Sequence, residues 1–332
     1  MKKLLIFYLT FILLLTSVAC QKGSGKTKVE VNEVTHSIFY APFYVAIEGG
    51  FFEKEGLEIS LTNGGGSDAS MTALLSGSCD IALLGPETII YTAIGGAKDT
   101  PKIFAQLTKR DGSFLMGRTR DNNFTWESLN GKEIIAGRRG GSPAMSLEYA
   151  LNKNGLKNGE NVTLNYDVQF NLTAAAFVAG TGDYVTMFEP TASEYQREGK
   201  AYIVASVGKE SGEVPFTTFA AKESFIKSNE DLIKKFTTAL YNAIKYIKET
   251  DTQKVAKLLE KSFPSTSLQS IVDSLNSYKE IDAWQEDLLL KKEAFNRLQE
   301  VMENAGELTT RVNYEDLVYN EITEDVYTKI FG

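Results

Sequence analysis

The fold is decided by residues 36–59, which read HSIFYAPFYVAIEGGFFEKEGLEI. The β-branched run 29–35 before this stretch predicts a strand. Pro42 suits the first turn of a helix, where its missing N–H would have no helical partner, and Gly49–Gly50 let the chain leave that helix. A second strand is predicted at 57–61 after a Glu-Gly turn. The stretch therefore predicts strand, loop, short helix, turn and strand, the opening unit of an α/β sheet.

The rest of the chain continues this alternation. Further strands are predicted at 80–84, 103–107, 114–116, 134–136, 162–168, 184–188 and 202–207, each followed by a helical pattern or a polar break. From Glu230 onward the chain is mostly helical. Strands that alternate with helices favour parallel sheets, whose ligands lie beyond the carboxyl ends of the strands. The sequence therefore predicts an α/β fold with a helical C-terminal tail.

The first 19 residues are predicted to be a signal peptide. Lys2 and Lys3 precede an apolar run at 4–15 that is short for a membrane span, and small residues follow it. Ala19 directly before Cys20 is typical of a bacterial lipoprotein cleavage site, although Ser17 stands where Leu is usual. A simple secretory signal or an uncleaved anchor is the alternative. If Cys20 is lipidated, residues 20–28 form a flexible tether to a membrane that the protein does not cross.

Composition excludes several classes of function. The chain has 332 residues and a formal charge of −8, which becomes −10 without Lys2 and Lys3, and a protein this acidic has no basic stripe for nucleic acid. Cys79 is the one cysteine besides Cys20, so the mature chain forms no intramolecular disulfide. A single histidine, His36, argues against His-rich zinc sites and a Ser-His-Asp triad. We expect no metal and no cofactor.

Three glycine-containing loops are the candidate binding elements. They span 64–68, 85–88 and 140–143, each between a predicted strand and a predicted helix. Glycine lets the backbone approach a ligand, and the free N–H groups of a first helical turn bind polar ligand atoms. The candidate residues are Gly65, Ser67, Asp68, Glu87, Thr88, Gly141 and Ser142. The alternative is that Ser67, Thr88 and Ser142 only cap their helices.

Aromatic and polar residues near the predicted crevice are further candidates. Ser37, Phe39 and Tyr40 lie in the loop after the first strand, and Tyr184 and Phe188 flank the second crevice edge. An aromatic ring there can stack on a planar ligand. The alternative is that each ring belongs to the core.

Charged candidates point to two different ligands. Arg138 follows a strand and precedes a glycine loop, where it could receive a sulfonate or carboxylate. Glu87 and Glu189 also occupy crevice-edge positions, where a carboxylate favours an amine or aminopyrimidine. An anion beside an unpaired Glu189 would bind poorly, because like charges about 4 Å apart cost about 4 kcal/mol at an effective dielectric constant near 20. An ion pair between Arg138 and Glu189 would remove this objection.

Five segments resemble one family of bacterial ABC-importer solute-binding proteins, the sulfonate, taurine, nitrate and thiamine-precursor group (SsuA/THI5-like or NMT1-like). The segments are APFYVAIEGGFFEKEGLEISL (41–61), LLSGSCDIALLGPETI (74–89), LNGKEIIAGRRGGSPAMSLEYALNKNGL (129–156), DYVTMFEP (183–190) and GEVPFTTFAA (212–221). The resemblance implies a type II periplasmic-binding-protein fold of two lobes, each a mostly parallel sheet flanked by helices. It implies a discontinuous first lobe, 29–112 with 216–332, and a second lobe at 113–215.

The resemblance also implies a function. It implies a monomeric receptor on the extracytoplasmic face of the cell membrane, lipid-anchored through Cys20, which delivers a small solute to an ABC permease and its ATPase. In the thiamine-precursor branch an acidic residue at the position that Glu189 matches contacts the pyrimidine, so we expect a nitrogen-bearing aromatic solute. Organic sulfonate, taurine or nitrate is the alternative.

Two other functional classes remain open. One is an enzyme like the eukaryotic pyrimidine synthases, which share this fold; the chain lacks their cysteine-rich motif, so we expect no enzymatic activity. The other is a binding module that feeds a sensor.

Overall fold

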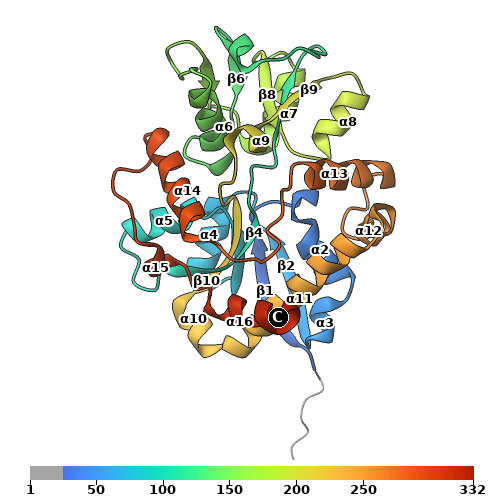
Figure 1. Cartoon of the computed structure of the whole chain (residues 1–332), viewed down its shortest axis with the longest axis vertical. Coiled ribbons are helices and arrows are strands. Elements are labelled where there is room, and N and C mark those ends of the chain that lie inside the picture. Colours follow the sequence, from blue (N-terminus) through green and yellow to red (C-terminus); the bar gives the residue numbers. More distant parts are fainter. Residues whose placement is uncertain (1–24) are drawn as a thin grey trace, which may run out of the picture.

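The computed structural model describes residues 25–332, which form two five-stranded sheets, one above the other along the long axis (Figure 1). The predicted signal peptide and Cys20 lie outside the described residues. The first strand, β1, already begins at Thr27. Thr27 and Lys28, predicted to belong to the tether, are therefore part of the sheet.

The first sheet has the strand order β2-β1-β3-β10-β4. β1 pairs in parallel with β2 and β3, and Val29 lies opposite Ile59 in the β1–β2 register. β10 pairs antiparallel with both β3 and β4. The strands are β1 (Thr27–Glu33), β2 (Leu57–Asn63), β3 (Ile81–Leu84), β4 (Pro101–Thr108) and β10 (Thr217–Lys222).

The second sheet has the same plan, with the order β7-β6-β8-β5-β9. β6 is parallel to β7 and β8, whereas β5 is antiparallel to β8 and β9. The strands are β5 (Phe114–Gly117), β6 (Glu133–Ile135), β7 (Thr163–Asn165), β8 (Tyr184–Met187) and β9 (Tyr202–Ser206). The prediction of mostly parallel sheets is confirmed, with one antiparallel strand in each.

The antiparallel strand is in each case the one that the chain enters on arriving from the other sheet. The chain leaves the first sheet after β4 and enters the second at β5, and it returns from β9 to β10. It reaches each new sheet at the edge that faces the other sheet, which is the carboxyl edge of the parallel strands. The arriving strand must therefore run opposite to them. The return crossing, predicted as an irregular break at 208–215, begins with a short helix, α9 (Val207–Ser211).

The helices cover the faces of both sheets (Figure 1). The predicted opening helix is confirmed as α2 (Ala41–Glu48), with Pro42 in its first turn. The other helices before the return crossing are η1 (Ile38–Tyr40), α3 (Phe51–Lys54), α4 (Ser67–Ser76), α5 (Glu87–Ile94), η2 (Trp126–Leu129), α6 (Ser142–Lys153), η3 (Phe170–Leu172), α7 (Thr173–Val178) and α8 (Thr191–Arg197). The C-terminal helices are α10 (Glu223–Ser228), α11 (Glu230–Glu249), α12 (Thr252–Leu259), α13 (Leu268–Glu280), α14 (Lys292–Asn304), α15 (Tyr314–Leu317) and α16 (Glu321–Phe331).

An aromatic core joins the opening helices to α11. The Phe236 ring of α11 lies 4.8 Å from Phe52 and 5.2 Å from Phe219 in β10, between ring centroids, and all three side chains are buried. Each ring removes about 150–250 Å² of largely apolar surface from water. The buried face of α11 therefore packs on the first sheet.

The C-terminal helices also reach the second lobe. Figure 1 shows α13 and α14 at the level between the two sheets, on opposite flanks. α13 packs against α8, and α14 packs against α6. The exact boundaries of the two lobes stay a prediction. Each sheet nevertheless contains the strands that lie within the corresponding predicted lobe. Among residues 25–332, no helix combines the length and apolar character needed to cross a bilayer.

Candidate functional site

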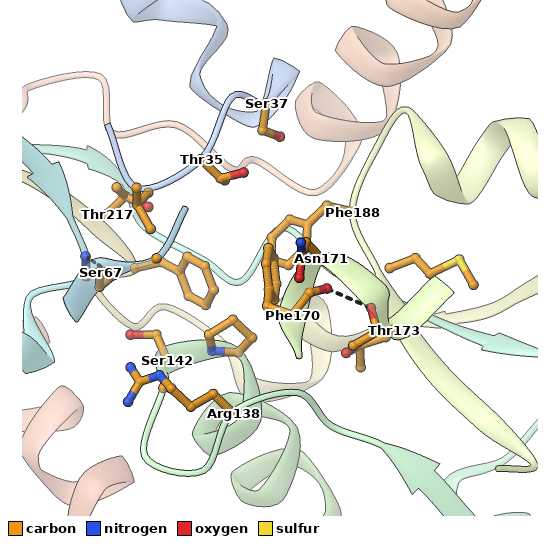
Figure 2. Close-up of a pocket in the computed structure, with 18 of the residues that line it drawn as sticks. Thr35, Ser37, Ser67, Arg138, Ser142, Phe170, Asn171, Thr173, Phe188 and Thr217 are labelled. Carbon is orange, nitrogen blue, oxygen red and sulfur yellow. Dashed lines mark hydrogen bonds between the residues drawn. The ribbon is translucent and has the colours of Figure 1, made fainter. Parts of the chain in front are cut away.

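A cavity of 270 Å³ lies between the carboxyl edges of the two sheets (Figure 2). Thr35 and Ser37, which follow β1, lie on one side of it, and Arg138 and Ser142 of the second lobe lie on the other. Its described lining is formed by Val34–Ser37, Tyr40, Gly66, Ser67, Gly85, Glu87, Ala136, Arg138, Gly141–Ala144, Phe170, Asn171, Thr173, Ala174, Thr186–Thr191, Phe216 and Thr217. The space is large enough to hold a small organic molecule.

All three predicted glycine loops end in helices at this cavity. α4 begins at Ser67, α5 at Glu87 and α6 at Ser142. Their N-cap residues are Gly66, Pro86 and Gly141, and none of them makes a side-chain cap bond, so the serines are first helical residues. Ser67 Oγ accepts a hydrogen bond from the backbone N–H of Gly85 at 3.1 Å. Capping therefore does not explain Ser67 and Ser142.

Glu87 is buried where α5 meets α6. Ser142 Oγ donates to Glu87 Oε2 across the two lobes at 2.6 Å, and the glutamate side chain is 1% exposed. Burial raises the pKa of the Glu87 carboxyl. The Ser142 hydroxyl, the backbone N–H groups of Glu87 and Ser142 and the charge of Arg138 offset part of that rise in pKa. The carboxyl group is thus held by the protein's own donors.

Glu189 is the second buried carboxyl group of the lining. Its Oε2 accepts from the backbone N–H of Ser193 at 2.9 Å, and its Oε1 accepts from Ser193 Oγ at 2.7 Å. Ser277 Oγ of α13 donates to the same Oε1 at 3.0 Å. A carboxylate has about four acceptor positions, so one position remains for a ligand.

One interpretation of the sequence requires an ion pair between Arg138 and Glu189. In the structure Arg138 pairs with Asp68 instead. Its Nη2 lies 3.2 Å from Asp68 Oδ1, and the two side chains are 46% and 63% exposed. An exposed pair of this kind contributes about 0–1 kcal/mol. Arg138 lines the cavity, whereas Asp68 is outside the lining.

Five predicted binding residues do not line the cavity: Phe39, Gly65, Asp68, Thr88 and Tyr184. Phe39 is fully buried and packs on the first crossing; a Cβ atom at Gly112 would come within 2.5 Å of its ring. Tyr184 begins β8, at the amino end of a strand whose carboxyl end faces the cavity. Thr88 Oγ1 instead donates to the carbonyl of Gly85 at 2.7 Å. The other predicted binding residues all lie in the lining: Ser37, Tyr40, Ser67, Glu87, Arg138, Gly141, Ser142 and Glu189.

The sequence interpretation missed the rim formed by Phe170, Asn171 and Thr173 (Figure 2). Thr173 begins α7 at the end of the segment that follows β7 and contains η3, as Ser67 begins α4 after the β2 loop. The same strand-loop-helix rule could have found it, but this loop contains no glycine to mark it. The Phe170 and Phe188 ring centroids are 5.8 Å apart, and Phe188 lies 6.1 Å from Phe216, so three rings form one side of the cavity.

His36 fixes the loop that carries Thr35 and Ser37. Its Nδ1 lies 2.9 Å from Glu33 Oε1, and its Nε2 lies 2.8 Å from the carbonyl oxygen of Ser262. Both partners are acceptors, so only the doubly protonated imidazolium donates to both. The hydrogen bond with Glu33 accordingly raises the pKa of His36, which burial alone would lower.

We expect the stability of the protein to decrease as the pH rises through this raised pKa. A histidine whose pKa is higher in the folded chain contributes its full stabilisation below the unfolded pKa of about 6.5 and loses it above the folded pKa. Urea unfolding across pH 5–9 should show this decrease, and His36→Gln should flatten it. Buried Asp111, whose pKa burial raises to about 7, also makes stability decrease as the pH rises, but over a more acidic range. The difference between the pH profiles of the unchanged protein and His36→Gln therefore isolates the contribution of His36. Identical pH profiles would refute this role.

Among residues 25–332, no group of three or more His, Cys, Asp or Glu side chains is placed to hold a metal ion. Cys79, the cysteine in this part of the chain, is buried in the core, and burial raises the pKa of its thiol to about 11. The described lining therefore offers hydroxyl, carboxyl, amide and aromatic groups, together with the imidazole of His36 and the guanidinium of Arg138.

Comparison with known proteins identifies the family. Residues 38–253 match the family model described as "NMT1/THI5 like". The YtlA protein of Bacillus subtilis (strain 168) is 43% identical over 317 residues, which cover 96% of this chain and 95% of that protein.

Solved structures show the same fold at low identity. The alkanesulfonate-binding protein SsuA from Xanthomonas axonopodis pv. citri has a TM-score of 0.72 at 18% identity, covering 89% of this chain and 99% of that one. The nitrate-binding protein NrtA from Synechocystis PCC 6803 has a TM-score of 0.72 at 14% identity, covering 92% and 89%. These likenesses confirm the periplasmic-binding-protein fold. With its sequence match over most of the length, this chain belongs to the NMT1/THI5-like family.

Proposed function

We propose that this protein is the solute-binding component of an ABC importer, which holds a small organic solute in the cavity between its two lobes and delivers it to a permease and its ATPase. The cavity at the carboxyl edges of both sheets is the observation that carries this proposal. The family supports it, and the relative YtlA carries the name of a binding protein. Anchoring through a lipid at Cys20, on the extracytoplasmic face of the membrane, and a monomeric state are parts of the same proposal.

We infer that the solute is nitrogen-bearing and planar. Two buried carboxyl groups, Glu87 and Glu189, line the cavity, and such groups favour ligands that donate hydrogen bonds. The rings of Phe170, Phe188 and Phe216 offer faces for a planar solute. An aminopyrimidine such as a thiamine precursor combines both properties.

An organic sulfonate, taurine or nitrate is the second candidate solute. It is favoured by Arg138 in the lining and by the structural neighbours, since SsuA is named as an alkanesulfonate-binding protein and NrtA as a nitrate-binding protein. The exposed pairing of Arg138 with Asp68 and the two buried carboxyl groups count against it. We do not propose an enzymatic role, because the lining has no cysteine and no cluster of metal ligands among its described residues.

A thermal-shift screen tests the nature of the solute. Aminopyrimidines and small amines should raise the melting temperature, because a ligand that binds only the folded form at about 100 times its Kd adds about 2.7 kcal/mol. Methanesulfonate, taurine and nitrate should leave it unchanged. Calorimetric titration of each hit against Phe188→Ala should show weaker binding if the ring stacks on the solute. A melting temperature raised by sulfonates and unchanged by amines would contradict the proposal of a nitrogen-bearing solute. The proposed receptor function would still stand.

A further inference from the structure

Three helix N-termini converge on one side of the cavity. α4 and α5 come from the first lobe and α6 from the second, and their first residues, Ser67, Glu87 and Ser142, all line the cavity. The first N–H groups of a helix have no helical partner, and with the helix dipole they form a favourable seat for an anion. Such an arrangement would be expected to attract a sulfonate, sulfate or nitrate.

The carboxyl group of Glu87 already occupies this seat. It accepts from Ser142 Oγ at 2.6 Å. Burial raises the pKa of this carboxyl group, and the Ser142 hydroxyl, the backbone N–H groups of Glu87 and Ser142 and the charge of Arg138 offset part of that rise. The carboxyl group lies directly over the backbone of Gly85, since a Cβ atom at Gly85 would be 2.1 Å from Glu87 Oε2. The neighbouring N–H of Gly85 is taken by Ser67 Oγ at 3.1 Å. The Ser142 hydroxyl and the backbone N–H groups of Gly85, Glu87 and Ser142 are therefore used within the protein.

We propose that Glu87 is a specificity-determining residue, whose carboxyl group occupies the anion seat, excludes anionic solutes from the cavity and leaves it selective for neutral or cationic ones. The proposal rests on the proposed receptor function and deepens it. An incoming anion must displace the glutamate from its donors or lie beside a second negative charge, and both weaken its binding. Even the protonated side chain fills the same space and holds the same serine.

Removal of the side chain should open the seat to anions. We expect Glu87→Ala and Glu87→Ser to bind sulfate and methanesulfonate at least 10-fold more tightly than the unchanged protein in calorimetric titrations, in a chloride buffer free of sulfonates. Glu87→Gln should show little gain, because its amide still fills the space. Serine is the second choice because it suits the start of a helix if the alanine variant fails to fold.

Two controls separate this effect from general changes. Glu230 is the exposed first residue of α11, far from the cavity lining, so Glu230→Ala makes the same substitution at a helix start without opening the seat. Ser142→Ala breaks the link between the lobes but keeps the glutamate. Neither variant should gain affinity for sulfate or methanesulfonate.

If folded Glu87→Ala or Glu87→Ser, verified by circular dichroism, shows no gain for either anion, or if the unchanged protein binds them equally well, Glu87 does not exclude anions. The gain in the variants is measured with inorganic sulfate and methanesulfonate and does not require the natural solute. A failed ligand screen and a failed specificity switch are therefore distinct outcomes.

Discussion

Gly208→Ala is expected to lower the free energy of unfolding by about 3 kcal/mol, at the upper end of the cost of overpacking. Gly208 lies in α9, on the return crossing, and a Cβ atom there would be 2.0 Å from the carbonyl oxygen of Asp111 on the outgoing crossing. The same atom would lie 3.0 Å from the carbonyl carbon of Asp111. Both neighbours are backbone atoms of a fully buried residue, so neither can rotate away. The two connections between the lobes must move apart.

Urea unfolding followed by circular dichroism measures this effect. Gly25→Ala is the matched control, because a Cβ atom at Gly25 meets no atom within 4 Å. It reports the entropic effect of the same substitution on the unfolded chain, which is expected to be small and stabilising or neutral. Since Gly208 joins the lobes at their crossing, solute affinity should decrease with stability. An unfolding midpoint equal to that of the control would show that the crossings are not in tight contact.

Glu189→Ala is expected to lower the free energy of unfolding by about 3 kcal/mol, because hydrogen bonds to a charged group contribute about 1.5–3 kcal/mol each and water entering the cavity replaces some of them. The carboxylate accepts from the N–H and hydroxyl of Ser193, at the start of α8, and from Ser277 of α13. The backbone N–H of Glu189 also donates to the Tyr278 hydroxyl at 3.0 Å. The substitution keeps this backbone bond, but loss of the carboxylate removes the bonds to Ser193 and Ser277 and therefore loosens the contact between α8 and α13.

Glu189→Gln is the matched control for this prediction. Its amide oxygen still accepts from Ser193 but carries no charge, so we expect a loss of about 1 kcal/mol. Ser277→Ala removes only the bond from α13, and a double-mutant cycle with Glu189→Ala measures the coupling between the two helices. A coupling energy near zero would show that the carboxylate serves α8 alone.

Much of the site's framework could be predicted from the sequence. The glycine loops before α4, α5 and α6 were expected to place helix starts at the crevice, and all three do. These features depend on neighbouring residues, because glycine and proline restrict the backbone locally and side-chain period follows the secondary structure. Ser67, Glu87 and Ser142 were found by this reasoning.

The positions and contacts of individual side chains could not be predicted in the same way. Phe39 lies in the expected loop, but its ring packs in the core. The ring lies against Gly112, which is 73 positions further along the chain. Phe170 was missed although its ring lines the cavity, because no glycine marks its loop. Tyr184 lies on the right strand but at the wrong end of it.

The sequence by itself determined the alternation of strands and helices, the family and the positions where helices begin, since each depends on short segments of the chain. Only the tertiary structure decided that the glutamate at the start of α5 turns back onto Gly85 and meets a serine from the other lobe. It also decided that Glu189 is bound by α13, and that Arg138 pairs with Asp68 rather than with Glu189. These contacts join segments far apart in the chain. Local sequence patterns do not distinguish between the possible partners of such a side chain, whereas burial and charge in the folded cavity do.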